Sequence, residues 1–212
     1  MNTMEEIFNK YCNEVIPYYF DDKKNETKEL FSPIINEILN NHISQDKPIF
    51  IHMLGIPGAG KTTYMNNNKE CFKDFLFLDF DMVMERLPEY REDVKKLGSV
   101  EAFEKWEISS RIAGYEVLLQ AIKKRLNIFF DHGGSPFLHV KLLEEVKKLG
   151  YKVKIVYIKC DIDTAIKRVK EREKITLRHT PEKMIIDREL LIKERVEQFK
   201  EIADEFVEMD NN

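Results

Sequence analysis

Residues 55–62 constrain the fold of this chain more than any other segment. They read Gly-Ile-Pro-Gly-Ala-Gly-Lys-Thr and match the pattern G-x-x-x-x-G-K-[ST] in full. The preceding run, residues 48–54, is apolar and β-branched, which is typical of a buried parallel strand, and a helix can begin at Thr62. A glycine-rich loop between a strand and a helix is the context in which this pattern holds phosphate groups. The segment therefore predicts a phosphate-binding loop, or P-loop.

The predicted loop has the parts that a nucleoside triphosphate requires. Glycine allows backbone angles that let consecutive N–H groups curl around an anion, and the positive end of the following helix points at the same phosphates. Lys61 brings a positive charge to the β- and γ-phosphates, and the Thr62 hydroxyl is placed to bind Mg²⁺. We therefore expect ATP or GTP, together with Mg²⁺. The residues expected to hold the nucleotide are Gly55, Pro57, Gly58, Ala59, Gly60, Lys61, Thr62 and Thr63.

Composition and charge indicate which classes of protein this chain can belong to. The chain has 212 residues, of which 43% are hydrophobic, enough for one α/β domain with a sizeable core. Its formal net charge of −4 argues against a nucleic-acid partner, which usually needs a basic surface. No apolar stretch approaches a membrane span, and the first residues lack the apolar region of a signal peptide, so we expect a cytoplasmic protein. Cys12, Cys71 and Cys160 are far apart, which favours free thiols over a metal site or disulfides.

Apolar runs alternate with helical patterns through the rest of the chain. We predict strands over 48–54, 75–78, 128–130, 153–158 and 205–209, and helices over about 99–126, 136–149, 163–173 and 180–203. This alternation predicts an α/β fold, a three-layer sandwich like that of P-loop NTPases and kinases with a mainly parallel five-stranded sheet. The expected domain spans residues 48–212.

Residues 1–47 carry no phosphate chemistry and are predicted to form a helical N-terminal extension. Residues 4–15 have apolar side chains at four-residue spacing, as an amphipathic helix does. Residues 21–26 are polar and are interpreted as a link. Ser32 and Pro33 look like the N-cap and first position of a second helix.

Functional groups of a parallel sheet gather beyond the carboxyl ends of its strands. Asp79 and Asp81 follow the second predicted strand and share side-chain parity if that strand continues through them. One of them could accept the proton of a nucleophile and the other could orient Mg²⁺ or its waters, and either could instead cap the next helix. We assign Asp79 to the metal, together with Thr62.

The segment 131–135, Asp-His-Gly-Gly-Ser, follows the third predicted strand and has the composition of a site loop. Asp131 could bind a substrate hydroxyl or a metal-bound water, and the two glycines allow close approach of the backbone to a ligand. A simple turn, with Ser135 capping the next helix, explains the segment equally well. We assign Asp131, Gly133, Gly134 and Ser135 to the substrate. The histidines at 132 and 179 are interpreted as bystanders, and Trp106 as part of the core.

Arginines gather after the fourth predicted strand, where a lid over the nucleotide would lie. The planar donor fork of arginine suits the charge that phosphoryl transfer develops. A solvated helix face with ion pairs explains the lysines of this stretch, but it explains Arg178 less well because that residue adjoins the Thr180–Pro181 cap.

Taken together, these segments resemble the zeta-toxin group of P-loop kinases over residues 48–210. The match is carried by the P-loop, by the Asp-Phe-Asp strand end, by the loop at 130–134, by the arginine-bearing helix at 168–172 and by the stretch 177–181. The resemblance implies that Asp81 is the catalytic base and that Lys61 acts on the phosphates. It implies two arginine clamps, one being Arg178 and the other Arg168 or Arg172.

The resemblance also implies a substrate and a partner. Several members of the group phosphorylate a hydroxyl of UDP-N-acetylglucosamine, and an antitoxin protein commonly covers their nucleotide site. This chain departs from the group on the substrate side, where Asp131 replaces a common Glu and Ser135 a common basic residue. Glu107 and Glu116 are the candidates for a sugar-holding carboxylate. We therefore expect an ATP/Mg²⁺-dependent kinase acting on a small-molecule hydroxyl, with a polynucleotide 5′-kinase and a non-catalytic nucleotide-dependent binding module as alternatives.

Overall fold

A parallel five-stranded sheet forms the centre of the protein, as predicted. The computed structural model describes residues 3–15, 21–133, 138–176 and 179–212, without the side chains of residues 11–15 and 21–24. The strands are β1 (Ile49–Leu54), β2 (Leu76–Leu78), β3 (Ile128–Gly133), β4 (Lys152–Lys159) and β5 (Glu205–Asp210). Their order across the sheet is β2-β3-β1-β4-β5, and every pair of neighbours is parallel. The strand that precedes the P-loop therefore lies in the middle of the sheet.

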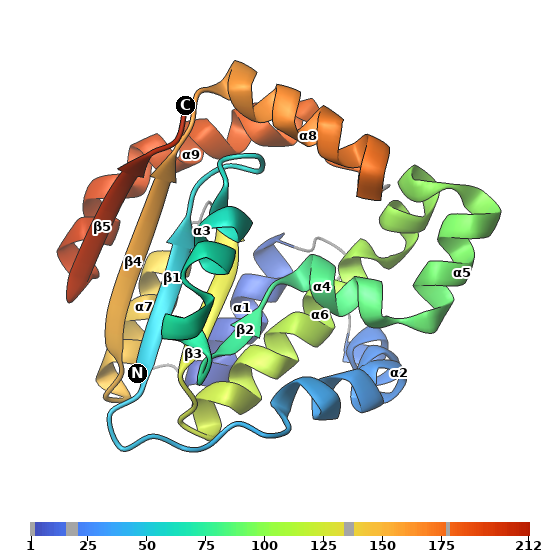
Figure 1. Cartoon of the computed structure of the whole chain (residues 1–212). Coiled ribbons are helices and arrows are strands. Elements are labelled where there is room, and N and C mark those ends of the chain that lie inside the picture. Colours follow the sequence, from blue (N-terminus) through green and yellow to red (C-terminus); the bar gives the residue numbers. More distant parts are fainter. Residues whose placement is uncertain (1–2, 16–20, 134–137, 177–178) are drawn as a thin grey trace.

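Helices cover both faces of this sheet, which confirms the predicted three-layer α/β sandwich (Figure 1). One face is covered by α6 (Ser99–Lys123), α7 (Leu138–Lys148) and α9 (Glu182–Ile202). On this face the His52 ring contacts His139 of α7 and Phe199 of α9. On the other face lie α3 (Lys61–Asn67) and a 3₁₀ turn, η1 (Lys69–Phe72), where Phe72 contacts Phe129.

Three further helices surround the carboxyl ends of the strands. They are α4 (Phe80–Arg86), α5 (Pro88–Leu97) and α8 (Ile162–Thr176). Helices α4 and α5 contact α6, and α8 contacts α9. In Figure 1, α8 crosses over the strand ends on one side and α4 and α5 lie on the other. The elements that follow β1, β2 and β4 therefore meet at the edge of the sheet where β3 also ends, and the functional groups are expected at this edge.

The N-terminal helices differ from the prediction. Helix α1 (Met4–Val15) matches the expected helix, but α2 (Asp21–Leu39) begins where a polar link was expected and runs through Pro33. The prediction of a helix start at Ser32 was wrong because the apolar stripe already includes Phe31, which is fully buried with Ile35 and Ile38. Burying these side chains against α6 outweighs the cost of an internal proline, about 3 kcal/mol.

Helices α1 and α2 lie on the face of the sheet that α6 and α7 cover. Phe8 and Phe31 join the same buried core as the sheet residues, and Lys28 forms an ion pair with Glu116 of α6 at 2.6 Å. The division into residues 1–47 and 48–212 stays a prediction. None of the helices in the described part of the chain combines the length and the apolarity that a membrane span requires.

Candidate active site

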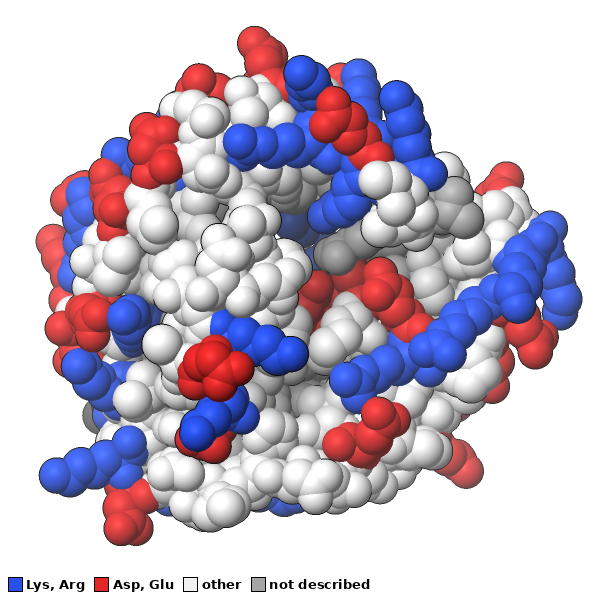
Figure 2. Space-filling model, in the orientation of Figure 1, with Lys and Arg blue, Asp and Glu red and all other residues white. Residues whose placement is uncertain are grey.

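A cavity of about 510 Å³ opens at the carboxyl edge of the sheet. The described residues that line it come from the P-loop and α3, from α4, α6 and β3, and from α8, α9 and the segment after β5. They are Pro57, Gly58, Gly60, Lys61, Thr62, Thr63, Asp79, Phe80, Asp81, Phe103, Glu107, Ser110, Arg111, Asp131, His132, Arg168, Val169, Arg172, His179, Thr180, Met184, Arg188 and Asn211. In Figure 2 this face is hollowed, with acidic side chains in the hollow and basic ones gathered over α8.

The loop from residue 55 to residue 60 turns tightly between β1 and α3. Gly60 is the N-cap of α3 and has a left-handed backbone, with φ at 99°. Gly58 has φ at 85°, and a Cβ there would lie 2.4 Å from the carbonyl oxygen of Ala165 in α8. Glycine is therefore required at both positions, by conformation and, at Gly58, also by the close approach of α8. Gly55 and Ala59 are buried behind the lining residues.

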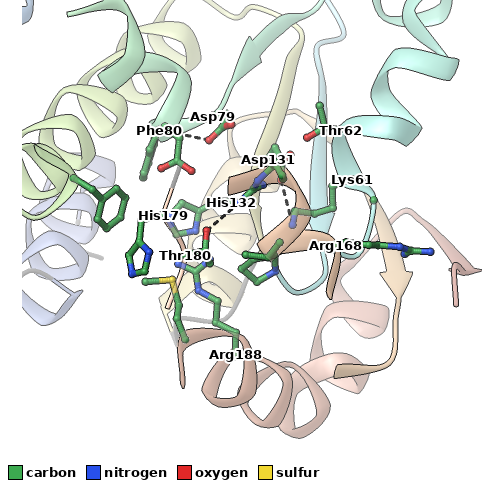
Figure 3. A pocket seen from close by; sticks show the side chains of 18 of the residues that line it. Lys61, Thr62, Asp79, Phe80, Asp131, His132, Arg168, His179, Thr180 and Arg188 are labelled. Atoms are coloured by element: carbon green, nitrogen blue, oxygen red, sulfur yellow. Dashed lines mark hydrogen bonds and ion pairs between the residues drawn. The ribbon is translucent and has the colours of Figure 1, made fainter. Parts of the chain in front are cut away.

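Lys61 lies across the P-loop, at the floor of the cavity. Its Nζ donates hydrogen bonds to the carbonyl oxygens of Gly55 and Ile56, at 3.1 and 3.2 Å. The same atom lies 3.8 Å from Oδ1 of Asp131, as Figure 3 shows. The ammonium group is thus held at the beginning of α3, where the helix dipole and the loop amides also favour an anion.

Asp131 is a nearly buried carboxylate on β3. Its side chain is 8% exposed, and burial raises its pKa to about 6, against the opposing effect of the Lys61 charge. Beyond it, Gly133 lies beside the P-loop, where its carbonyl oxygen accepts a hydrogen bond from the Gly55 N–H at 3.4 Å. Gly133 is not among the lining residues. Gly134 and Ser135 lie outside the described residues, so their assignment to the substrate stays a prediction.

Asp79 and Asp81 both line the cavity, but they do not lie on one strand. Strand β2 ends at Leu78 and α4 begins at Phe80, so the parity argument for the two carboxylates was wrong. Asp79 is the N-cap of α4, and its Oδ1 accepts a hydrogen bond from the Asp81 N–H at 3.0 Å. Asp81 therefore lies in the first turn of α4. The chain starts a helix here instead of extending β2, because the Asp79 side chain accepts a hydrogen bond from an N–H group that has no partner within the helix.

Phe80, between the two aspartates, anchors this turn. Its ring is buried against Tyr115 of α6 and His132 of β3, with ring centroids 4.7 and 4.8 Å apart. Gly114, also in α6, makes room for the ring, since a Cβ there would lie 2.1 Å from the Phe80 ring. A mid-helix glycine costs about 1 kcal/mol relative to alanine. We infer that Gly114 is needed for the close approach of Phe80, which sets the position of Asp81.

Replacing Gly114 with alanine is expected to displace Phe80 and, with it, Asp81. The overpacking should lower the free energy of unfolding by about 1–3 kcal/mol and lower kcat more than nucleotide affinity. Urea denaturation and steady-state kinetics measure both effects. The double variant with Phe80→Leu should recover part of the lost stability, because the smaller side chain leaves room for the new methyl group. Two additive losses would contradict this account.

The arginines of α8 have different surroundings. The Arg172 guanidinium interacts electrostatically with Asp79 and Asp131, and its Nη2 donates to the Thr180 hydroxyl at 2.9 Å. Its Nε is buried with no hydrogen-bond partner among the described residues.

Arg168 does not show this arrangement. It donates a hydrogen bond from Nη1 to the backbone carbonyl oxygen of Asn211 at 2.7 Å. Arg178 lies outside the described residues, and its role as a clamp stays a prediction.

Two further charged groups line the cavity that the sequence did not single out. Arg188 lies on the buried face of α9, one turn after Met184, and its charge acts on Asp131 and His132. Figure 3 shows its side chain directed toward these two residues. A basic residue between the buried Ile185 and Ile192 is the signal that could have found it. On α6, Arg111 pairs with Glu107 at 2.5 Å.

The structure also places His179, Trp106 and the two candidate sugar-holding carboxylates. Glu107 lies at the cavity, whereas Glu116 pairs with Lys28 of α2. His179 lines the cavity and its Nδ1 lies 2.7 Å from a Glu173 carboxylate oxygen. Trp106 is packed against the core, and its Nε1 donates to Asp93 at 2.7 Å. Within the described residues, no group of three or more side chains could hold a metal ion by itself.

A P-loop after the central strand, with an arginine-bearing helix across the strand ends, places the chain among proteins with a P-loop kinase fold. The zeta toxin family model matches residues 35–211. The chain therefore belongs to the zeta-toxin family, which confirms the resemblance seen in its motifs. No protein with a curated description matches the chain in sequence.

Solved structures share this fold at low sequence identity. A structure from the PezAT chromosomal toxin–antitoxin system of Streptococcus pneumoniae has a TM-score of 0.64 and 18% identity, over 91% of this chain and 79% of that one. The structure of AvrRxo1-ORF1:-ORF2 with ATP has a TM-score of 0.59 and 11% identity, over 94% and 61%. A putative kinase from Chloroflexus aurantiacus has a TM-score of 0.54 and 14% identity, over 78% and 89%.

Proposed function

We propose that the protein transfers the γ-phosphoryl group of ATP to a hydroxyl of a small molecule, with a nucleotide sugar such as UDP-N-acetylglucosamine as the first candidate. The observation that supports this most is the position of Asp81. A carboxylate in the first turn of α4 lines the same cavity as Lys61 and Thr62 of the P-loop. Phosphoryl transfer needs a phosphate-binding charge and a proton acceptor within one enclosed site.

Several of the charged side chains in the cavity have a proposed role in the transfer. The acceptor oxygen forms a bond to the γ-phosphorus while the bond to the bridging oxygen of ADP breaks, and the hydroxyl proton moves to the Asp81 carboxylate. Lys61 and Arg172 neutralise charge on the transferred group and on the leaving phosphate. Arg172 is favoured over Arg168 for this task because its charge acts on Asp79 and Asp131, at the middle of the site. The Glu107–Arg111 pair and Asp131 are proposed to meet the acceptor.

Mg²⁺ fits the donors at this site. Thr62 is exposed to the cavity beside Lys61, and Asp79 lines the cavity as well. Mg²⁺ takes one or two protein oxygens and obtains its other ligands from phosphates and water, so the Thr62 hydroxyl and one carboxylate are enough to hold it. When bound, the ion neutralises charge on the β- and γ-phosphates. We propose Thr62 and Asp79 as its protein partners.

A screen for the acceptor tests the proposal. Purified protein is incubated with Mg²⁺ and ATP or GTP, and with nucleotide sugars, other metabolites or single-stranded oligonucleotides, and products are read by mass spectrometry. Gain of one phosphate on a nucleotide sugar supports the proposal. Transfer to oligonucleotide 5′ ends would favour the polynucleotide kinase, and tight nucleotide binding without any acceptor would favour the binding module.

Replacing Lys61 with alanine is expected to weaken nucleotide binding and turnover together. Charge-assisted hydrogen bonds of this kind contribute about 1.5–3 kcal/mol, so the Kd for Mg·ATP should rise by about 10- to 150-fold. Equilibrium titration with ATP measures the change. Lys69→Ala is a matched control, because Lys69 lies in the exposed η1 turn and does not line the cavity. Unchanged affinity in the Lys61 variant would remove this residue from the site.

We also propose a protein partner that covers this site. The support is that the PezAT structure, which shares this fold, comes from a toxin–antitoxin system, and that this chain belongs to a family of toxins. Helices α1 and α2 do not provide such cover within the chain, since no described residue before Pro57 lines the cavity. Co-purification with the product of an adjacent reading frame, and loss of ATP binding in the complex, would test the partner.

A further inference from the structure

Asn211, a residue far from the P-loop in the sequence, lines the cavity and forms a hydrogen bond to the P-loop backbone. The Asn211 side chain, just after β5, donates a hydrogen bond from Nδ2 to the carbonyl oxygen of Ala59 at 2.8 Å. Ala59 is fully buried, so this carbonyl needs a partner within the protein. A P-loop turns its N–H groups toward the phosphates, which leaves carbonyl groups such as this one facing the surrounding protein.

The fit between Asn211 and the loop depends on Gly60. A Cβ at position 60 would lie 2.3 Å from Asn211 Nδ2, so a side chain there would displace the amide from its place beside the loop. The amide therefore occupies a space that the loop keeps open, and it contacts the last two residues before the helix that carries Lys61 and Thr62.

The backbone of Asn211 is itself held in place. Its N–H donates to the carbonyl oxygen of Lys159 at 3.0 Å, one residue beyond the last β4–β5 pair, Lys159 with Asp210. Its carbonyl oxygen accepts the 2.7 Å hydrogen bond from Arg168. Figure 3 shows the Arg168 side chain directed away from Asp131 and Arg188, in keeping with this bond. Asn211 thus joins the sheet, the P-loop and α8 at one point.

We propose that Asn211 is a positioning residue for nucleotide binding: its amide holds the Ala59–Gly60 turn in the curvature that receives the phosphates. The inference rests on the proposed binding of a nucleoside triphosphate. Preorganised donors need no rearrangement when the ligand arrives, so a residue that fixes the loop contributes to affinity through the loop amides. Without its amide, the turn can relax before binding.

Titration with Mg·ATP tests the proposal on the full chain. Asn211→Ala removes one neutral hydrogen bond, and the Kd should rise by about 2- to 12-fold. Asn211→Asp should raise it further, because a carboxylate cannot donate to the Ala59 carbonyl and would repel it. Asn212→Ala is the matched control: Asn212 Oδ1 accepts from the Asp161 N–H at 2.6 Å, but Asn212 does not line the cavity. This control should alter thermal stability alone.

A double-mutant cycle separates positioning from a general structural role. Gly60→Ala forces a methyl group against the Asn211 amide, and this clash disappears in Gly60→Ala/Asn211→Ala, whereas backbone strain at position 60 remains in both. The combined loss of affinity should therefore be smaller than the sum of the single losses. Equal Kd values for wild type, Asn211→Ala and Asn211→Asp would overturn the inference and leave the proposed function intact. A wild-type chain that binds no nucleotide would overturn both.

Discussion

Replacing Asp81 with asparagine is expected to abolish phosphoryl transfer while Mg·ATP still binds. Asparagine has nearly the same shape but cannot accept a proton at neutral pH, and a positioned general base contributes about 10²- to 10⁴-fold to a rate. The bond from the Asp81 N–H to Asp79 comes from the backbone, so α4 keeps its N-cap in the variant. Single-turnover kinetics measure the transfer step, and titration measures the Kd.

Asp79→Asn is the matched comparison for this prediction. Asparagine is also a good N-cap, so the first turn of α4 should persist while the charge proposed to face Mg²⁺ is lost. This variant should need a higher Mg²⁺ concentration for half-maximal activity, and saturating Mg²⁺ should restore part of its rate. Saturating Mg²⁺ should restore nothing in Asp81→Asn. Turnover near the wild-type value in Asp81→Asn would remove Asp81 from the mechanism.

The nucleotide side of the site could be predicted because its signal is local. The P-loop is a continuous segment, and the strands on either side of it are marked by apolar runs, so the sheet and the crevice at its edge followed from patterns within a few residues. Asp79, Asp81 and Asp131 line the cavity as that reasoning expected. Their detailed roles depend on where each strand ends, which the pattern places only to within a few residues.

Other features depend on contacts between distant segments. The sequence predicts a helix start at Ser32 and Pro33, because proline is common at that position. In the structure, the packing of Phe31 against the core lets the helix continue through Pro33. The sequence signal for Arg188 is weak, because the residue lies in the middle of a long helix whose charged residues are mostly exposed. Asn211 is not part of a sequence motif. Its proposed role depends on a hydrogen bond to Ala59, and the two residues come together only when the sheet has folded.

A cluster of three histidines on the α7 side of the sheet leads to a prediction about stability. His52 and His139 are buried, and His132 is half-buried at the wall of the cavity. His52, His132 and His139 lie side by side, with ring centroids 5.0 Å apart for the first and last and 4.6 Å for the last two. Burial lowers the pKa of His52 to about 3, aided by the charge of Lys61, and lowers the pKa of the other two well below their usual value. Neither His52 ring nitrogen has a hydrogen-bond partner among the described residues.

The sign of the effect follows from where protons bind. Below pH of about 6.5, the unfolded chain takes up protons on these histidines and the folded chain does not, so stability falls as the pH falls. Asp131 acts in the opposite direction, because its pKa near 6 lets the folded state bind a proton before the unfolded state does. Among these four groups the three histidines outweigh the one carboxyl. Their combined effect is a loss on the order of 2–3 kcal/mol for each pH unit between about pH 5.5 and pH 4.

His52→Leu should therefore make the protein less sensitive to acid. Leucine fills a similar volume against Phe130 and Phe199 and removes one of the three groups that resist protonation, so the loss per pH unit should shrink by about 1.4 kcal/mol. Urea denaturation at pH 7 and pH 5 measures the difference. His42→Leu is the control, because His42 is only partly buried and should change the pH dependence much less. A His52 variant as acid-sensitive as the wild type would mean that this ring already accepts a proton inside the folded core.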